Sequence, residues 1–287
     1  MPAERKKINM QTKKSNVIYE NWKVYNKNEK LMFRCNEKKA NWYLKRNLAI
    51  VLNQERSIRL VFEAKGEGHD INDYMIEDRS NNCVVCNNKE ELTTHHVVPD
   101  MYRKAMPLCI KSKSSRDLLL LCKHCHDKYE DEAIKLKKEI VQQYNCPIEG
   151  KGWIHSAENR YVRKAATALV KFKDKLPEDR TKELEEKVKT YQSSSSTLKD
   201  LPWDELLETC CQLKDMYHGP NFIDHGTFVV QQLMEKEKKT IIVNDQEQEQ
   251  WPQLESFIKL WRKHFLDHLQ PKYLSNKWTI DGEIYNY

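Results

Sequence analysis

The residues best suited to chemistry lie between Cys83 and Glu130. This stretch holds two Cys-x-x-Cys pairs, a His-His step between them and a histidine directly after the last cysteine: Cys83/Cys86, His95-His96, Cys122/Cys125 and His126. Two such cysteine pairs can deliver four thiolates to one tetrahedral Zn²⁺ ion. Because four sulfurs leave no position for water, we expect a structural zinc.

Two other interpretations of the cysteines stay open. The four thiols can be unrelated buried side chains, or they can form disulfides. Disulfides are less favoured, because we see no secretory signal peptide and the other five cysteines are scattered along the chain. The spacing of the two pairs favours zinc over both alternatives.

The histidines are available for a second site. Neighbouring residues of a strand point to opposite faces, so one of His95 and His96 can bind a metal while the other faces a substrate or water. Residues 126–138 have the apolar spacing of a helix. The expected order is therefore cysteine pair, hairpin, cysteine pair and helix, and it places His95, His96, Asp117 and His126 where they could surround one divalent cation.

The pattern CVVC…HHVVP…RDLLLLCKHCH resembles the motif of the HNH nuclease family, the ββα-metal finger, in its zinc-stabilised form. The resemblance implies roles for single residues. His96 would be the general base, His95 its metal-ligating neighbour and His126 a second metal ligand. Asp117 stands where the family usually has the Asn that orients the loop and the base. Glu130, one helical turn after His126, could add an oxygen ligand.

Residues 19–49 and 260–278, together with this motif, also resemble the region after the exonuclease domain in the exonuclease 3'-5' domain-containing protein 2 family. That resemblance runs from about Val17 onward. The sequence shows no DEDD-type acidic motif. The resemblance therefore implies an HNH-like module and its flanks, but no exonuclease activity. It also implies a location in the nucleus or mitochondrion, and a protein partner that supplies a second nuclease activity.

The chemistry expected from these roles is hydrolysis of phosphodiester bonds in DNA or RNA. A neutral imidazole can take a proton from water near neutral pH. A divalent cation at His95 and His126 would stabilise charge on the scissile phosphate. Oxygen and imidazole ligands suit Mg²⁺ or Mn²⁺, and two imidazoles favour Mn²⁺ or a transition ion.

A second hypothesis from another class stays open: a zinc-built nucleic-acid-binding or accessory module without activity. In it, the histidines are ordinary core or surface residues, or His126 replaces a cysteine as a zinc ligand. Three imidazoles that converge on one point, apart from the sulfurs, would favour the enzyme. Imidazoles that point apart would favour the module.

Composition gives weaker constraints. The chain has 287 residues, 32% charged residues, seven glycines and a net charge of +6, which favours helix and suits a polyanionic partner. No apolar run is long enough to span a membrane. Four cations flank the proposed site and are candidate phosphate contacts, although a solvated charge run is as good an interpretation: Lys104, Lys111, Lys113 and Arg116.

The fold class expected is α+β, with a zinc-stabilised ββα-metal finger embedded in a mostly helical chain. We expect a disordered basic arm (1–16), an α+β lead-in (17–80), the HNH-like module (81–145) and a helical C-terminal region (146–287). In that region a helix is expected at 203–216, and residues 235–250 show no core pattern beyond Ile241, Ile242 and Val243. His264 and His268 lie four apart on the helix 251–269, a metal-binding spacing. Because we identify no cysteine or acid that completes such a site, we interpret that helix as packing on the module.

Overall fold

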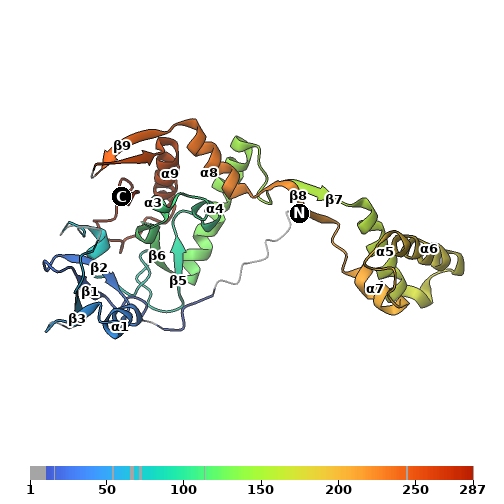
Figure 1. The fold of residues 1–287 in the computed structure, drawn as a ribbon, viewed down its shortest axis with the longest axis horizontal. Helices are drawn as coiled ribbons and strands as arrows, with labels where there is room; N and C mark the ends of the chain where they lie inside the picture. The colour runs from blue at the N-terminus through green and yellow to red at the C-terminus, as the bar shows by residue number, and fades with distance from the viewer. Residues whose placement is uncertain are drawn as a thin grey trace. The chain divides into compact units, whose positions relative to one another are not determined.

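A two-stranded hairpin followed by a long helix lies at the centre of the fold (Figure 1). The computed structural model describes residues 11–15, 17–53, 55–64, 68–70, 73–112, 114–243 and 245–286. Strand β5 (Leu92–His96) pairs antiparallel with β6 (Leu118–Cys122), and α4 (Lys123–Tyr144) begins at the next residue. The segment between the strands contains two short helices and a 3-10 turn: α2 (Asp100–Arg103), α3 (Leu108–Lys111) and η2 (Ser114–Asp117).

The main core lies between this hairpin, α4 and helix α9 (Pro252–Leu269). Apolar side chains recur every three or four residues on both helices, which gives each helix one continuous buried face. Helix α8 (His225–Lys236) adds Val229, Val230 and Leu233 to the same cluster. The core therefore joins segments far apart in sequence, and α9 packs against α4 as the sequence predicts.

The N-terminal part forms a small sheet of its own. The strand order is β2 (Leu31–Cys35), β1 (Trp22–Tyr25), β4 (Ser57–Leu60) and β3 (Ala49–Val51), with helix α1 (Glu37–Lys45) between β2 and β3. Asn36 caps α1, because its side chain accepts a hydrogen bond from the Lys39 N–H at 2.9 Å. A 3-10 turn, η1 (Tyr74–Ile76), leads to the first cysteine pair. The segment expected to mix helix and strand therefore contains a four-stranded sheet and one α-helix among its described residues.

The described chain divides into two compact units. One comprises residues up to 148 together with 226–287, and the other comprises 149–225. The second unit has a separate core formed by three helices, α5 (Ala157–Phe172), α6 (Glu178–Ser194) and α7 (Trp203–Cys211). A short turn, η3 (Lys173–Lys175), separates the first two. The four-part division predicted from the sequence stays a prediction, and residues 1–10 and 16 of the expected basic arm lie outside the described residues.

One prediction for this region is wrong in detail. The helix expected at 203–216 ends at Cys211, and Met216–Ile223 forms strand β8, which pairs with β7 (Lys151–His155). Gly219 lies inside β8 because the two strands approach closely there, and a side chain at this position would meet the Gly152 carbonyl at 2.7 Å. Strands β9 (Lys239–Val243) and β10 (Gln246–Gln250) form a hairpin in which no strand residue is buried, and Ile242 is 77% exposed.

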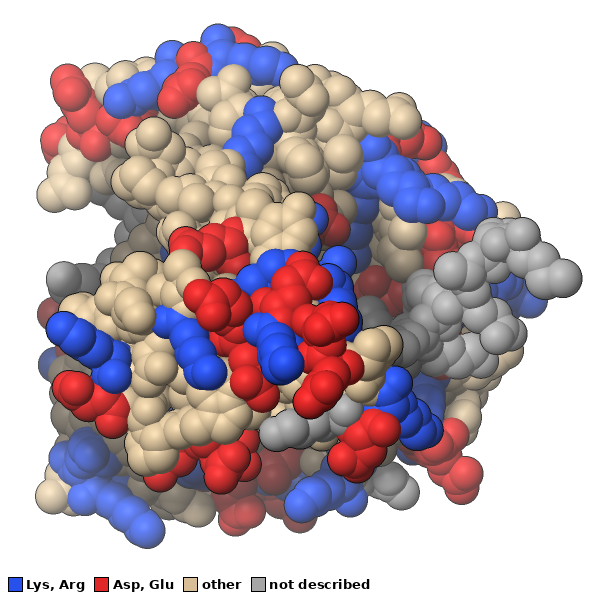
Figure 2. All heavy atoms as spheres, turned by 90° about the vertical axis from the view of Figure 1, so that its right-hand side faces the viewer, with Lys and Arg blue, Asp and Glu red and all other residues tan. Residues whose placement is uncertain are grey.

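Two surface properties bear on partners. Among the residues that the structure describes, no helix combines the length and apolar character needed to cross a lipid bilayer. Figure 2 shows Lys and Arg side chains interspersed with Asp and Glu, and among the residues coloured on that face they form no continuous basic surface. The candidate cysteines and histidines lie at the hairpin and α4, in the unit that contains the main core.

Candidate metal centres

The first cysteine pair lies in a tight turn before β5. The Asn87 N–H donates to the Cys83 carbonyl at 2.9 Å, and Asn87 adopts a left-handed conformation with φ of 66°. The Val84 N–H donates to the Leu120 carbonyl of β6 at 3.0 Å, which fixes the turn against the hairpin. Cys83 and Cys86 are therefore positioned by backbone hydrogen bonds beside the end of β6.

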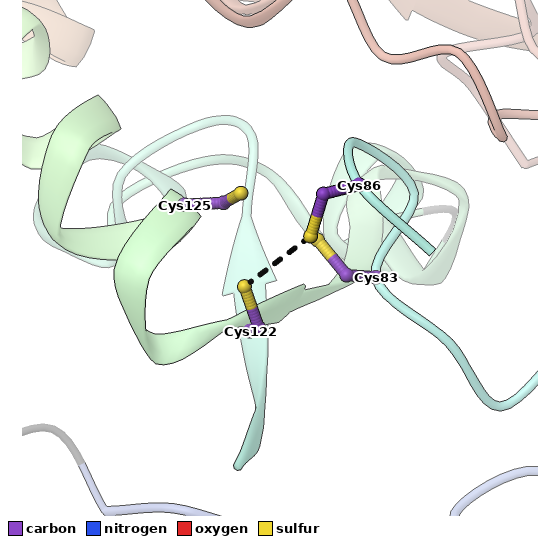
Figure 3. Close-up of side chains that lie close together, drawn as sticks. All are labelled: Cys83, Cys86, Cys122 and Cys125. Carbon is purple, nitrogen blue, oxygen red and sulfur yellow. Dashed lines mark hydrogen bonds between the residues drawn. The ribbon is translucent and has the colours of Figure 1, made fainter. Parts of the chain in front are cut away.

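The second pair lies where β6 becomes α4. Cys122 is the last residue of β6 and the N-cap of α4, and Cys125 lies in the first helical turn. The four sulfurs point toward one another (Figure 3), and all four lie within 4.8 Å of one another. Cys86 Sγ and Cys122 Sγ are 3.6 Å apart, close to the roughly 3.8 Å that Zn–S bonds of about 2.3 Å give in a tetrahedron. The donor set and its spacing fit one zinc ion.

His95 lies on β5 and points into the core, where it is 3% exposed. The Phe265 ring of α9 stacks on it at 5.6 Å between centroids, and the Tyr129 ring meets it edge-on at 4.9 Å. Burial, and then the neighbouring His126, hold the pKa of His95 well below its usual range. The imidazole is therefore neutral at pH 7, the form that binds metals.

His126 lies on α4, one residue after the last cysteine. Its Nδ1 is 2.8 Å from the Thr93 hydroxyl, and that hydroxyl donates its proton to the Leu121 carbonyl at 2.9 Å. Because the Thr93 proton is used there, His126 must donate from Nδ1, which leaves its Nε2 with a lone pair. A hydrogen bond of this kind on the second nitrogen is typical of metal-ligating histidines.

The two imidazoles meet at one point. His95 Nδ1 and His126 Nε2 are 3.0 Å apart, and Glu130 Oε1 is 3.8 Å from that His126 nitrogen. Two ligands at about 2.1 Å from a metal and at a right angle to each other lie about 3.0 Å apart. His95, His126 and Glu130 thus form a second donor group that fits a divalent cation, separate from the four sulfurs. The other Glu130 oxygen is 3.4 Å from Lys137 Nζ.

His96 points to the other face of β5. It lines a cavity of about 20 Å³ with Arg103, Asp117 and Arg262, which leaves room for about one water molecule. Burial, and then the Arg103 charge, lower the pKa of His96, so it is neutral near pH 7. The prediction that His95, His96, Asp117 and His126 surround one cation is therefore wrong for His96 and Asp117, because the strand alternates strictly at this position.

Asp117 is buried in an ion pair. Its two carboxylate oxygens accept hydrogen bonds from Arg262 Nε at 2.9 Å and Nη2 at 3.0 Å, and both side chains are nearly inaccessible. Burial raises the pKa of Asp117, and the charge and hydrogen bonds of Arg262 oppose this rise. The Asp117 carbonyl also accepts the Val97 N–H at 2.9 Å, which fixes the chain directly after His96.

The four cations expected to contact phosphate have different environments. Lys104 is 75% exposed and pairs with Asp100, and Lys111 donates to the Lys104 carbonyl at 3.1 Å. Arg116 is 3% exposed and pairs with Asp73 at 3.0 Å, so its guanidinium is not accessible to a phosphate. Lys113 lies outside the described residues.

Sequence reasoning missed three residues that form the histidine site and its neighbourhood. Thr93 precedes His95 by two positions on β5, so the period of a strand could have placed both on one face. Phe265 and Arg262 reach the module from α9, more than 130 positions later, and no local pattern points to those contacts. Contacts such as those of Phe265 and Arg262 can be identified only when the position of α9 against the hairpin is known.

The comparisons with known proteins add a similarity over most of the chain. No protein-family model and no solved structure matches it. Exonuclease 3'-5' domain-containing protein 2 from Homo sapiens is 30% identical over 270 residues, which are 92% of this chain and 40% of that protein. The protein of that name from Mus musculus is 32% identical over 253 residues, 86% of this chain and 36% of its own.

A plant protein is similar over a shorter stretch. Protein RRP6-like 3 from Arabidopsis thaliana is 30% identical over 198 residues, 61% of this chain and 22% of that protein. The chain therefore spans less than half the length of the curated relatives it matches. Over most of its own length, it is homologous to a segment of the proteins named exonuclease 3'-5' domain-containing protein 2.

Proposed function

We propose that this protein is a metal-dependent HNH-type nuclease that hydrolyses phosphodiester bonds in DNA or RNA. The observation that supports it best is the convergence of His95 Nδ1, His126 Nε2 and the Glu130 carboxylate beside, but apart from, the four sulfurs. The donors lie on a hairpin and the helix that follows it, the order expected of a ββα-metal finger. The names of the relatives, with their exonuclease domain, are consistent with nucleic-acid chemistry.

In this proposal each protein group has one role. A divalent cation at the histidine site, Mg²⁺ or more readily Mn²⁺, would supply positive charge to the scissile phosphate. Thr93 holds the His126 ring with Nε2 toward that site, while Phe265 and Tyr129 hold the neutral His95 ring. The carboxylate of Glu130 adds an oxygen donor and negative charge.

His96 is the proposed general base. As a neutral imidazole it takes a proton from water, whose oxygen then attacks phosphorus as the ester P–O bond breaks. The Asp117 carbonyl and the Arg262–Asp117 pair hold the chain around His96, so Asp117 has a positioning role. The water would enter on the cavity side of β5, beside Arg103.

A surface next to His126 is suited to the substrate backbone. A cavity of about 390 Å³ is lined by Gln11, Thr12, Lys13, Thr93, Thr94 and His126. The Lys13 N–H donates to the Leu92 carbonyl at 2.8 Å, which places this N-terminal segment along the outer edge of β5. Lys13 thus brings a positive charge to the cavity, while Lys104 and Lys111 remain proposed contacts elsewhere on the module.

Other properties of the relatives are proposals for this chain. It spans 40% of the human relative, so a separate polypeptide or segment would have to supply any exonuclease activity. The nuclear or mitochondrial location is proposed on the same resemblance.

Two observations favour a second candidate, a catalytically inactive nucleic-acid-binding or accessory module. The first is that only two of the three imidazoles converge, because His96 points to the face of β5 opposite His95. The second is how closed the site is. His95 is 3% exposed, and the cavity beside His96 has room for about one water. Neither face of β5 offers a phosphodiester an open path to both histidines, so the proposed enzyme needs local opening around the site.

Cleavage assays separate the two candidates. The purified chain is incubated with plasmid, single-stranded DNA and RNA in Mg²⁺ or Mn²⁺. We expect His96→Ala to lower turnover about 10²–10⁴-fold while its zinc content stays equal to that of the wild type. The control is His124→Ala, because His124 is exposed between the second pair of cysteines.

The outcomes are distinct. Equal cleavage by wild type and His96→Ala would reject His96 as the base. Absence of cleavage by the wild type, with oligonucleotide binding in the same buffer, would favour the accessory module.

A further inference from the structure

His264 and His268 lie one helical turn apart on α9, at the face that meets α4. Their rings stack with centroids 4.0 Å apart and an interplanar angle of 30°. The acidic residue between them, Asp267, pairs with Lys263 instead. The structure supplies an acidic partner from α4, because Glu132 Oε2 lies 3.7 Å from His268 Nε2.

A backbone hydrogen bond prepares His268 for metal binding. Its Nδ1 is 2.8 Å from the His264 carbonyl oxygen. A carbonyl can only accept, so His268 Nδ1 carries the proton and Nε2 carries the lone pair. This lone pair is on the nitrogen nearest Glu132, and an Nδ1–H bound to a carbonyl is a common arrangement in histidine ligands.

His264 has an equivalent partner in Tyr129. Its Nδ1 is 3.1 Å from the Tyr129 hydroxyl, which is buried at the interface of α4 and α9. Burial raises the pKa of Tyr129, so the phenol stays protonated and can either donate or accept. With the remaining nitrogen bound to a metal, His264 Nδ1–H would donate to the Tyr129 oxygen.

We propose that His264, His268 and Glu132 form a third metal site, for Zn²⁺ or another first-row transition ion such as Ni²⁺ or Cu²⁺. Two imidazoles and one carboxylate are a ligand set these ions take, with further positions filled by water. Nitrogen ligands of a tetrahedral ion at about 2.1 Å lie about 3.4 Å apart. The three donors do not all lie within 4.8 Å of one another without an ion, so binding requires the side chains of His264, His268 and Glu132 to rotate toward one point.

One cation competes for this position. Lys135 Nζ donates to both Glu132 oxygens at 2.8 Å, and its side chain is 66% exposed. An exposed pair of this kind is weak, so a divalent ion can displace the ammonium. The site is distinct from the sulfur and His95/His126 groups, although the Tyr129 ring contacts both His95 and His264.

The test counts bound ions. Full-length chain with one zinc per chain, enough for the cysteine cluster alone, and with His126→Ala, which removes a ligand of the inner histidine site, is titrated with Ni²⁺ in a calorimeter. Adding His268→Ala to this background should abolish one equivalent, because it removes a ligand of the proposed site. The variant leaves Tyr129 and its contact with His95 in place. Adding His155→Ala instead is the control, since His155 is exposed on β7.

Two further variants test the geometry. Glu132→Gln keeps the shape but removes the anionic donor and should weaken Ni²⁺ binding. Tyr129→Phe removes the partner of His264 Nδ1 and should weaken it about 10-fold or more. A Cu²⁺ spectrum should show two coupled nitrogens that become one in His268→Ala.

Equal stoichiometry and affinity in His268→Ala and its background would overturn the site. That outcome would leave the nuclease proposal intact, because the count does not depend on cleavage. Likewise, an extra equivalent that persists in His268→Ala but is lost in His155→Ala would place the ion elsewhere.

Discussion

Thr93 determines which nitrogen of His126 faces the candidate ion. Its single hydroxyl proton is used by the Leu121 carbonyl, so the oxygen can only accept from His126 Nδ1. A threonine that contacts no ion would therefore control the affinity for one. The effect acts through the tautomer and orientation of the ring.

Thr93→Val should weaken Mn²⁺ binding at the His95/His126 site about 10–100-fold, because the valine has the same shape but cannot hold His126 Nδ1. The measurement is Mn²⁺ titration followed by electron paramagnetic resonance. Thr94→Val is the matched control, since Thr94 lines the same cavity but the hydroxyl that holds His126 Nδ1 is that of Thr93. Equal affinities in the two variants would contradict the proposed role of Thr93.

At the scale of single residues, the sequence predicts which residues are metal donors better than it predicts how they are arranged in space. The four cysteines follow from residue type and spacing, the pair His95/His126 follows from the family resemblance, and the structure brings each set together. His95 and His96 do not share a site, because the strand stays regular and turns them to opposite faces. Arg116 shows a similar limit, since only its tertiary partner Asp73 removes it from the surface.

Helix α9 connects to the hairpin through the Arg262–Asp117 pair. The guanidinium also donates to the carbonyls of Ile280 at 3.0 Å and Gly282 at 2.6 Å, so one side chain ties the C-terminal segment to the start of β6. The ends of α9 could be predicted from its apolar pattern. Its docking could not, because the pattern says which face is buried but not against what.

Arg262→Met should lower the free energy of unfolding by about 3–5 kcal/mol, because it leaves the Asp117 carboxylate buried without its partner. Urea denaturation measures the change. Lys263→Met is the control, since Lys263 pairs with Asp267 on the exposed side of the same helix and should cost at most about 1 kcal/mol. Similar losses in both variants would refute the importance assigned to the buried pair.

The N-terminal segment is the element nearest to the proposed phosphate cavity. Lys13→Ala should weaken binding of a single-stranded oligonucleotide and reduce the slope of log K against log salt by about 0.7–1. Fluorescence anisotropy at several salt concentrations gives both quantities. Lys14→Ala makes the same change in charge at a residue that does not line the cavity, so a larger effect there would exclude Lys13 as the contact.

At the scale of the whole molecule, the main core and the core of the second unit do not depend on the same interactions. The cysteine cluster belongs to the core of the main unit, whereas the helices α5, α6 and α7 enclose a core without any of these four cysteines. Zinc should therefore stabilise one unit and not the other.

Removal of zinc by a strong chelator should increase hydrogen exchange across residues 83–144 and leave 157–211 protected. Structural zinc sites supply folding free energy directly, so the loss should extend from the cysteines into β5, β6 and α4. Mass spectrometry of peptides, with released zinc measured by a metal dye, follows both events. Exchange that rises equally in the two segments, or no released zinc, would contradict this assignment.

The ribbon of β7 and β8 has a practical consequence. Lys151 and Ile223 are register partners, so the segment 149–225 departs from the chain and returns to it at adjacent backbone positions. A segment with adjacent ends can be exchanged for a short turn without stretching what remains. A trimmed protein made in this way would keep both groups of metal donors and offer a smaller object for crystallisation with oligonucleotides.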